Sequence, residues 1–245
     1  MVYSTYTSTI GLSSKAIELE TANNTDLTFL EKEGDIGFIF NIFYNSVDNY
    51  YYQVNTVLVA EAGHNQGENE HGEEEHVGEE HDAEDGEHNG DEHGGELPVF
   101  LFKTDNVILH GFEAQIAWQL SNEFKATVFS DFVRARLKSG GDSPRTPPLR
   151  FGSQFSYQIA ILSAHLDTTR YQSQDRIVDF ETKTDSYTLV DISISYDLPI
   201  LNNNIAVYFK GNNLTDTEAR VHTSFLQDLE PRSARKLSNG VRGYF

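Results

Sequence analysis

Six of the nine histidines in the chain lie in one acidic segment, residues 61–96. Carboxylates flank these histidines closely, as Glu75 precedes His76 and Glu80 precedes His81. Imidazole and carboxylate groups together suit zinc, copper or nickel, whereas carboxylates alone would favour calcium or magnesium. The segment therefore predicts a metal-collecting tract, here called the His/acid tract, whose imidazoles belong to His64, His71, His76, His81, His88 and His93.

Glycine recurs throughout the His/acid tract, and glycine combined with dense charge disfavours a stable fold. We expect a flexible loop that binds each ion more weakly than a rigid tetrahedral site, because it loses backbone entropy when it wraps the ion. Weak, exchangeable capture suits the handing of ions to a transport path. The alternative is an acidic loop that only keeps the surface solvated, but six histidines are denser than such a spacer needs.

Catalytic zinc chemistry is not expected. The nearest approach to a zinc-hydrolase motif, the run His76–His81, matches neither His-Glu-x-x-His nor His-x-x-Glu-His, and it contains a glycine. The chain has no cysteine, which excludes disulfides and thiolate metal sites. Outside the tract, His222 lies in the last long loop and is a candidate second-stage ligand. We expect His110 and His165 to be satisfied or solvent-facing.

The acidic charge is concentrated in this one segment. The tract holds fifteen Asp and Glu and no Lys or Arg, so it carries −15 of the formal −20 and leaves only −5 elsewhere. Such a block inside a nearly balanced chain indicates an inserted functional tract rather than a generally acidic protein. Nucleic acid is not an expected partner, because its phosphates would be repelled.

The elements that must position this tract are strands. Apolar and polar residues alternate in long runs, for example over 36–44, 108–120 and 190–198. Several runs extend over about ten to fifteen residues, longer than the usual five or six of globular strands. Asp, Glu, Gln, Asn and Ser occupy the opposite faces. Length and alternation together predict an all-β, antiparallel transmembrane barrel with a polar lumen.

Loop lengths support this interpretation. We expect nine strands near 20–31, 35–50, 105–120, 123–137, 148–161, 163–176, 185–198, 203–216 and 238–245. Short turns at 31–34, 120–122, 160–162 and 199–202 alternate with long polar loops at 51–104, 138–147, 177–184 and 217–237. Outer-membrane barrels have short periplasmic turns and long extracellular loops. If Phe245 ends at the periplasm, residues 51–104, with the tract inside them, are extracellular.

Nine strands leave two unpaired edges, which lipid does not tolerate. There is no apolar run of about eighteen residues for a membrane helix, and residues 1–10 lack the features of a secretory signal. We therefore expect the chain, residues 1–245, to be part of a larger barrel.

Four segments carry a resemblance to a known family. Asn212-Asn213-Leu214-Thr215-Asp216 is similar to the Asn-Leu-x-Asp element that closes a penultimate strand in TonB-dependent outer-membrane receptors. Residues 219–228 with Pro231 resemble the last loop of the zinc-uptake branch of these receptors, and residues 239–245 resemble their final strand. Residues 18–24 are similar to a segment where a strand leaves an extracellular loop. Ser233-Ala234-Arg235 departs from the Pro-Gly-Arg expected there.

The resemblance implies a 22-stranded barrel of which this chain is the C-terminal part, without the plug domain, the TonB box and the early strands. It also implies zinc uptake, with copper or nickel as alternatives, driven by the TonB–ExbB–ExbD complex through the missing N-terminal region. Further expected partners are outer-membrane lipid and, through a final strand that ends at Phe245, the barrel assembly machinery. Two other interpretations remain open: a siderophore or haem receptor, and a soluble extracellular metal-sequestering β protein.

Overall fold

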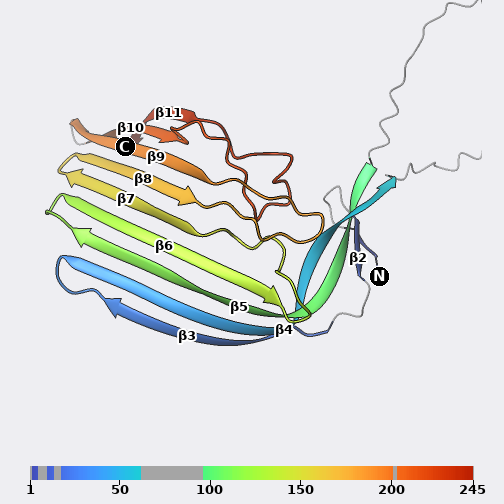
Figure 1. The fold of residues 1–245 in the computed structure, drawn as a ribbon. Helices are drawn as coiled ribbons and strands as arrows, with labels where there is room; N and C mark the ends of the chain where they lie inside the picture. The colour runs from blue at the N-terminus through green and yellow to red at the C-terminus, as the bar shows by residue number, and fades with distance from the viewer. Residues whose placement is uncertain (1, 5–9, 14–17, 62–95, 201–202, 245) are drawn as a thin grey trace, which may run out of the picture.

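The structure, a computed structural model, describes residues 2–4, 10–13, 18–61, 96–200 and 203–244. In these ranges no helix is long and apolar enough to cross a bilayer. All strands join one sheet (Figure 1). They are β1 (Val2–Ser4), β2 (Ile10–Ser13), β3 (Thr21–Glu31), β4 (Ile36–Glu61), β5 (Glu96–Gln119), β6 (Phe124–Leu137), β7 (Arg150–Ile159), β8 (Leu162–Tyr171), β9 (Tyr187–Ile200), β10 (Asn203–Asn212) and β11 (Lys236–Tyr244).

The series from β3 to β11 is antiparallel, and each strand pairs with its neighbours in sequence. This confirms the expected run of nine antiparallel strands. No pairing joins β3 to β11 among the described residues, so these two strands are the edges of the nine-strand series. Two short strands were not expected: β1 pairs with β2, and β2 lies parallel to β5 at residues 99–102.

Short and long connections alternate between the two ends of the sheet, as predicted. Residues 32–35, 120–123 and 160–161 are the described turns at one end, and residues 138–149, 172–186 and 213–235 are long loops at the other. Strands end earlier than expected near 176 and 216, since β8 stops at Tyr171 and β10 at Asn212. After β10 the backbone turns sharply, because Asn213 and Asp216 adopt φ values of 49° and 53°.

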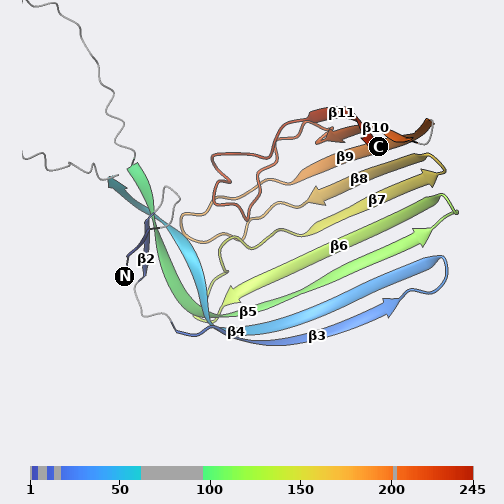
Figure 2. The same ribbon diagram turned by 180° about the vertical axis from the view of Figure 1, so that it is seen from behind.

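One prediction was wrong: residues 51–104 are not one polar loop. Strand β4 continues to Glu61 and β5 begins at Glu96, so residues 51–61 and 96–104 form a paired hairpin. The physical reason lies in the residue types, because Tyr, Val, Leu and Phe dominate both arms and favour strands. The arms project beyond the other strands, which is visible from both sides of the sheet (Figures 1 and 2).

The apolar faces point outward rather than into a core. Side chains on the predicted apolar faces remain solvent-accessible in the isolated chain, among them Ile36 (51%), Trp118 (49%) and Val241 (70%). Only seven hydrophobic residues are buried in the described ranges, and six of them form two small clusters. A single curved sheet with this exterior matches a membrane barrel fragment, and it contradicts a soluble sandwich with a dry interior.

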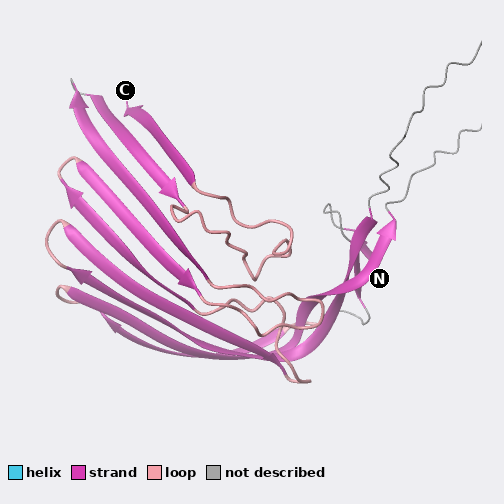
Figure 3. Ribbon diagram, turned by 45° about the horizontal axis from the view of Figure 1, so that its top comes forward, coloured by secondary structure: helices cyan, strands magenta, loops and turns pink. Residues whose placement is uncertain are grey.

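The opposite, inner face carries rows of polar side chains. One cross-strand row runs from Asn41 through Glu113 and Asp131 to Arg150, and the Arg150 guanidinium lies 2.8 Å from the Asp131 carboxylate. At the loop end the same face carries a small apolar cluster of Val47, Val107 and Ala135. The long loops fold into the concave side of the sheet there (Figure 3).

Candidate functional site

The metal ligands predicted in the His/acid tract, including Glu75 and Glu80, lie outside the described residues. Both ends of the tract are described. Glu61 and Glu96 are register partners at the tip of the β4–β5 hairpin. The tract is therefore joined to the sheet through two strands that pair with each other.

We call residues 50–61 of β4 and 96–106 of β5 the hairpin extension. Near its base, Tyr50 and Tyr52 stack with ring centroids 6.3 Å apart. Further out, the register shifts between Asn55 and Val59, and the Thr56 hydroxyl donates to the Val99 carbonyl at 2.5 Å. A bulge of this kind increases the local twist of a hairpin.

The three long loops, residues 138–149, 172–186 and 213–235, form what we call the loop cap. Gln174 is almost fully buried, and its side-chain amide donates to the Thr146 carbonyl at 2.9 Å. The Gln227 amide donates to the Thr182 hydroxyl at 2.8 Å, which joins the second loop to the third. The Arg220 guanidinium donates to the Gln227 carbonyl within the third loop. Side chains of the second and third loops thus bond groups of the neighbouring loop.

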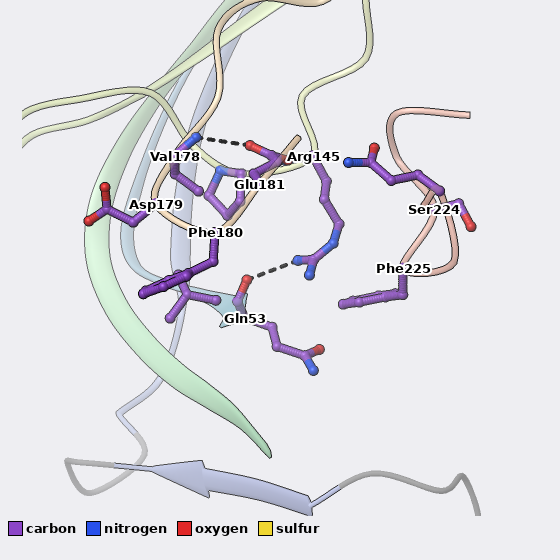
Figure 4. A pocket seen from close by; sticks show the side chains of 11 residues that line it. Gln53, Arg145, Val178, Asp179, Phe180, Glu181, Ser224 and Phe225 are labelled. Atoms are coloured by element: carbon purple, nitrogen blue, oxygen red, sulfur yellow. Dashed lines mark hydrogen bonds between the residues drawn. The ribbon is translucent and has the colours of Figure 1, made fainter. Parts of the chain in front are cut away.

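Glu181, in the second loop of the loop cap, lies beside Arg145 and Val178 (Figure 4). Its side chain is 8% exposed. One carboxylate oxygen accepts the Arg145 backbone N–H at 2.7 Å, and the other accepts the Val178 N–H at 3.0 Å. A buried carboxylate is costly unless it is paired and hydrogen-bonded, and here both oxygens are used.

His222, the predicted second-stage ligand, is fully buried against this carboxylate. Its Nε2 lies 3.4 Å from Glu181 Oε1, and its Nδ1 lies 3.2 Å from the Thr184 hydroxyl. Nε2 has no hydrogen-bond partner among the described residues. Burial lowers the pKa of His222, an effect that Glu181 opposes and Arg145 reinforces. The imidazole is therefore held neutral near pH 7 inside the loop cap.

Arg145 connects the loop cap to the hairpin extension. Its Nη1 donates to the Gln53 carbonyl of β4 at 2.9 Å, and its guanidinium carbon lies 3.7 Å from the centroid of the Phe225 ring (Figure 4). Phe225 in turn meets Phe100 of β5 edge to face at 6.0 Å. Burial lowers the pKa of Arg145, and Glu181 opposes this effect. At physiological pH the guanidinium stays protonated.

Within the ranges that the structure describes, no three His, Cys, Asp or Glu side chains are grouped so that they could hold a metal ion. His110 and His165 are exposed on strands, and His165 Nδ1 lies 3.0 Å from the Ser156 hydroxyl. Sequence reasoning missed Arg145 and Glu181, since a lone Arg and a lone Glu in polar loops carry no distinctive spacing.

Comparison with known proteins decides the family. A family model described as "TonB dependent receptor-like, beta-barrel" matches residues 2–214. The chain belongs to the TonB-dependent receptor β-barrel family. Members of this family are transporters rather than enzymes, and their barrels reside in the bacterial outer membrane.

Solved structures show the same fold. The copper transporter OprC matches with a TM-score of 0.67 and 14% identity, over 94% of this chain and 32% of its own. The FrpB iron transporter from Neisseria meningitidis gives 0.60 and 12%, over 96% and 33%. The siderophore receptor PirA from Acinetobacter baumannii gives 0.58 and 15%, over 92% and 32%. The chain thus spans about a third of the length of these transporters.

Proposed function

We propose that this chain is the C-terminal barrel part of a TonB-dependent receptor that imports zinc across the outer membrane, with the His/acid tract as its collector. The proposal rests on the occurrence of a metal-binding tract on a hairpin of a transporter barrel. Six histidines among fifteen carboxylates belong to a segment whose two ends, Glu61 and Glu96, face each other at the tip of a projecting hairpin. That hairpin emerges from a barrel of a transporter family.

The chemistry of the residues supports separate roles for the tract, which captures ions, and the barrel, which lets them pass. Imidazole and carboxylate bind zinc, and a charge of −15 concentrates divalent cations near the hairpin tip. The same end of the sheet carries all three long loops, which in this architecture face the outside of the cell. Ions captured there stand at the entrance of the lumen, whose inner face is polar. Passage through the lumen requires energy, which we assign to the TonB–ExbB–ExbD complex.

The outer face of the sheet and its last strand suit the two other proposed partners, which are lipid and the barrel assembly machinery. Exposed apolar side chains alternate along the strands and suit outer-membrane lipid. The final strand, β11, pairs with β10 over its whole length, and we assign its recognition to the barrel assembly machinery.

Equilibrium binding of zinc to the intact purified receptor tests the collector role. The informative variant replaces all six tract histidines with Asn, which preserves the length and the −15 charge of the tract. We expect it to lose most of its zinc capacity at micromolar free zinc. Retention of full capacity would refute imidazole ligation. Replacing the six carboxylates nearest to these histidines with Gln forms the matched variant that separates charge from ligation.

Competition between metal ions for the receptor identifies the ion that it transports. Zinc, copper and nickel suit the same ligands, so the three are compared at equal free concentration in binding and in growth under limitation for each metal. A zinc-limited growth defect of the six-histidine variant supports zinc. A defect confined to copper, to nickel or to chelated iron would assign the receptor to that cargo instead.

A further inference from the structure

We propose that Arg145 is a positioning residue that holds the hairpin extension over the barrel mouth, so that the His/acid tract delivers its ions at the lumen entrance. The inference rests on the proposed function for the delivery step. The clamp itself rests on the contacts of Arg145 alone, and these can be tested without any metal.

The hairpin extension needs such a clamp because few contacts hold it. Beyond Asp48, β4 has no strand partner on its outer side among the described residues, and Val57 is 76% exposed. Strand β2 pairs with β5 at residues 99–102 and β1 pairs with β2, but neither β1 nor β2 has a further strand partner among the described residues, so neither ties the hairpin to the rest of the sheet. The direction of the hairpin relative to the barrel must therefore be set near its base, where Gln53 lies.

Arg145 reaches three separate parts of the molecule from that point. Its guanidinium donates to the Gln53 carbonyl and stacks on the Phe225 ring, while its own backbone N–H is fixed by Glu181. The backbone at Arg145 has a φ of 54°, an unfavourable region for a residue with a side chain. The Glu181 carboxylate holds that conformation and so aims the side chain at β4.

The ring of Phe225 extends the clamp to the second arm of the hairpin. It contacts both the Arg145 guanidinium and the Phe100 ring of β5, so Arg145 is linked to both arms of the hairpin extension. A planar guanidinium suits this position, because it donates in its plane and stacks through its face. An ammonium group could keep the hydrogen bond and would lose the stacking.

Fixing the hairpin extension keeps the tract near the entrance, and tethering of this kind raises the local concentration of captured ions. Release of the clamp would let the hairpin sample many directions. Delivery at scarce zinc would then slow, while saturated uptake would not change, because the lumen path is intact.

The first test measures the direction of the hairpin. The chain contains no cysteine, so spin labels are introduced at Val57→Cys on the hairpin extension and Asn122→Cys in a turn at the far end of the sheet. We expect the distance distribution in the intact receptor to widen at least about twofold in Arg145→Ala. Arg145→Lys should give an intermediate width. An unchanged width in Arg145→Ala would overturn the clamp.

The second test measures zinc uptake by the same variants. Arg145→Ala should raise the half-saturating zinc concentration by roughly tenfold with the maximal rate unchanged. Arg145→Lys should restore part of the shift. Arg176→Ala is the matched control, since Arg176 lies over the Phe132 ring of β6 and should affect neither measurement.

The outcomes separate the two proposals. A widened distribution with unchanged uptake would overturn the positioning role, and a fall in maximal rate alone would mean that Arg145 supports the barrel rather than delivery. Failure of the wild-type receptor to bind or import zinc would instead refute the proposed function. That result would leave the distance measurement of the clamp intact.

Discussion

The hairpin extension and the loop cap lie at the same end of the sheet but are held in opposite ways. In the hairpin extension, Val57, Leu58 and Val59 are more than half exposed, and strand pairing of β4 with β5 and of β5 with β2 orders the backbone. In the loop cap, Glu181 and His222 are 8% and 0% exposed, and hydrogen bonds join all three loops. The hairpin extension projects from the sheet, whereas the loop cap is held together by contacts between its loops.

This difference suits the proposed role in metal import. A segment that collects ions works better when it extends into solvent and when its ligands release the ion. The entrance to the lumen works better when its shape is fixed. Arg145 lies where the two regions meet, and the apolar cluster of Val47, Val107 and Ala135 lies beneath their common base. The comparison therefore predicts large effects of substitutions in the loop cap, smaller ones at the shared base, and almost none at the hairpin tip.

The largest effect is expected from Glu181→Ala. It leaves two partly buried backbone N–H groups without acceptors and removes the carboxylate beside Arg145, so the free energy of opening the loop cap should fall by about 3 kcal/mol. Hydrogen exchange of residues 138–149 and 172–186 measures this. The control is Glu230→Ala, an exposed residue of the third loop. Equal protection from hydrogen exchange in the two variants would show that Glu181 does not stabilise the loop cap.

A smaller loss is expected from Val107→Ala at the shared base. Val107 is fully buried, and truncation of such a side chain costs about 2 kcal/mol. Because the cluster supports both regions, exchange should increase in the hairpin arms and in the first loop together. Val57→Ala, at an exposed site, is the matched control. Loss of protection in only one region would show that the two do not share a base.

Acidification should loosen the loop cap and leave the hairpin ladder unchanged. Burial lowers the pKa of His222 below its ordinary 6.5, so the open state binds a proton more readily than the closed state. Cap stability is therefore full above about pH 6.5 and declines as the pH falls towards the lowered pKa. Hydrogen exchange, corrected for its intrinsic pH dependence, is compared at pH 7.5 and 5.5. His222→Gln should abolish the difference, and its persistence would implicate another group.

The smallest effect is expected at the hairpin tip. Leu58 is largely exposed, so Leu58→Ser should change stability by less than about 0.5 kcal/mol. Thermal unfolding in detergent measures this. A loss of several kcal/mol would mean that an unseen surface covers the hairpin extension, and the contrast between the two regions would fail.

Much of the fold was accessible from the sequence, because alternation has a strict period of two and loop lengths separate the two ends of a barrel. The runs at 36–44 and 108–120 predicted β4 and β5 correctly in their membrane-spanning parts. The hairpin extension was missed, since Tyr50, Tyr51 and Tyr52 are followed by polar Gln53 and Asn55, which interrupt the apolar pattern. Pairing with β5 decides that segment, and pairing is not a local property.

The candidate site divides in the same way. The ligand types in the His/acid tract could be predicted from the sequence, because metal affinity depends on side-chain chemistry. The surroundings of His222 could not, since its burial depends on Glu181 and Thr184 from another loop. Similarly, Arg145 acts through a carbonyl and a ring that lie far away in sequence.

Zinc uptake by cells as a function of free zinc tests the central claim most directly. The comparison is between the intact receptor and a variant lacking residues 64–93, at equal outer-membrane levels. We predict that the deletion raises the half-saturating zinc concentration and leaves the maximal rate unchanged, because the tract collects ions and the barrel carries them. Superimposable uptake curves would contradict the account.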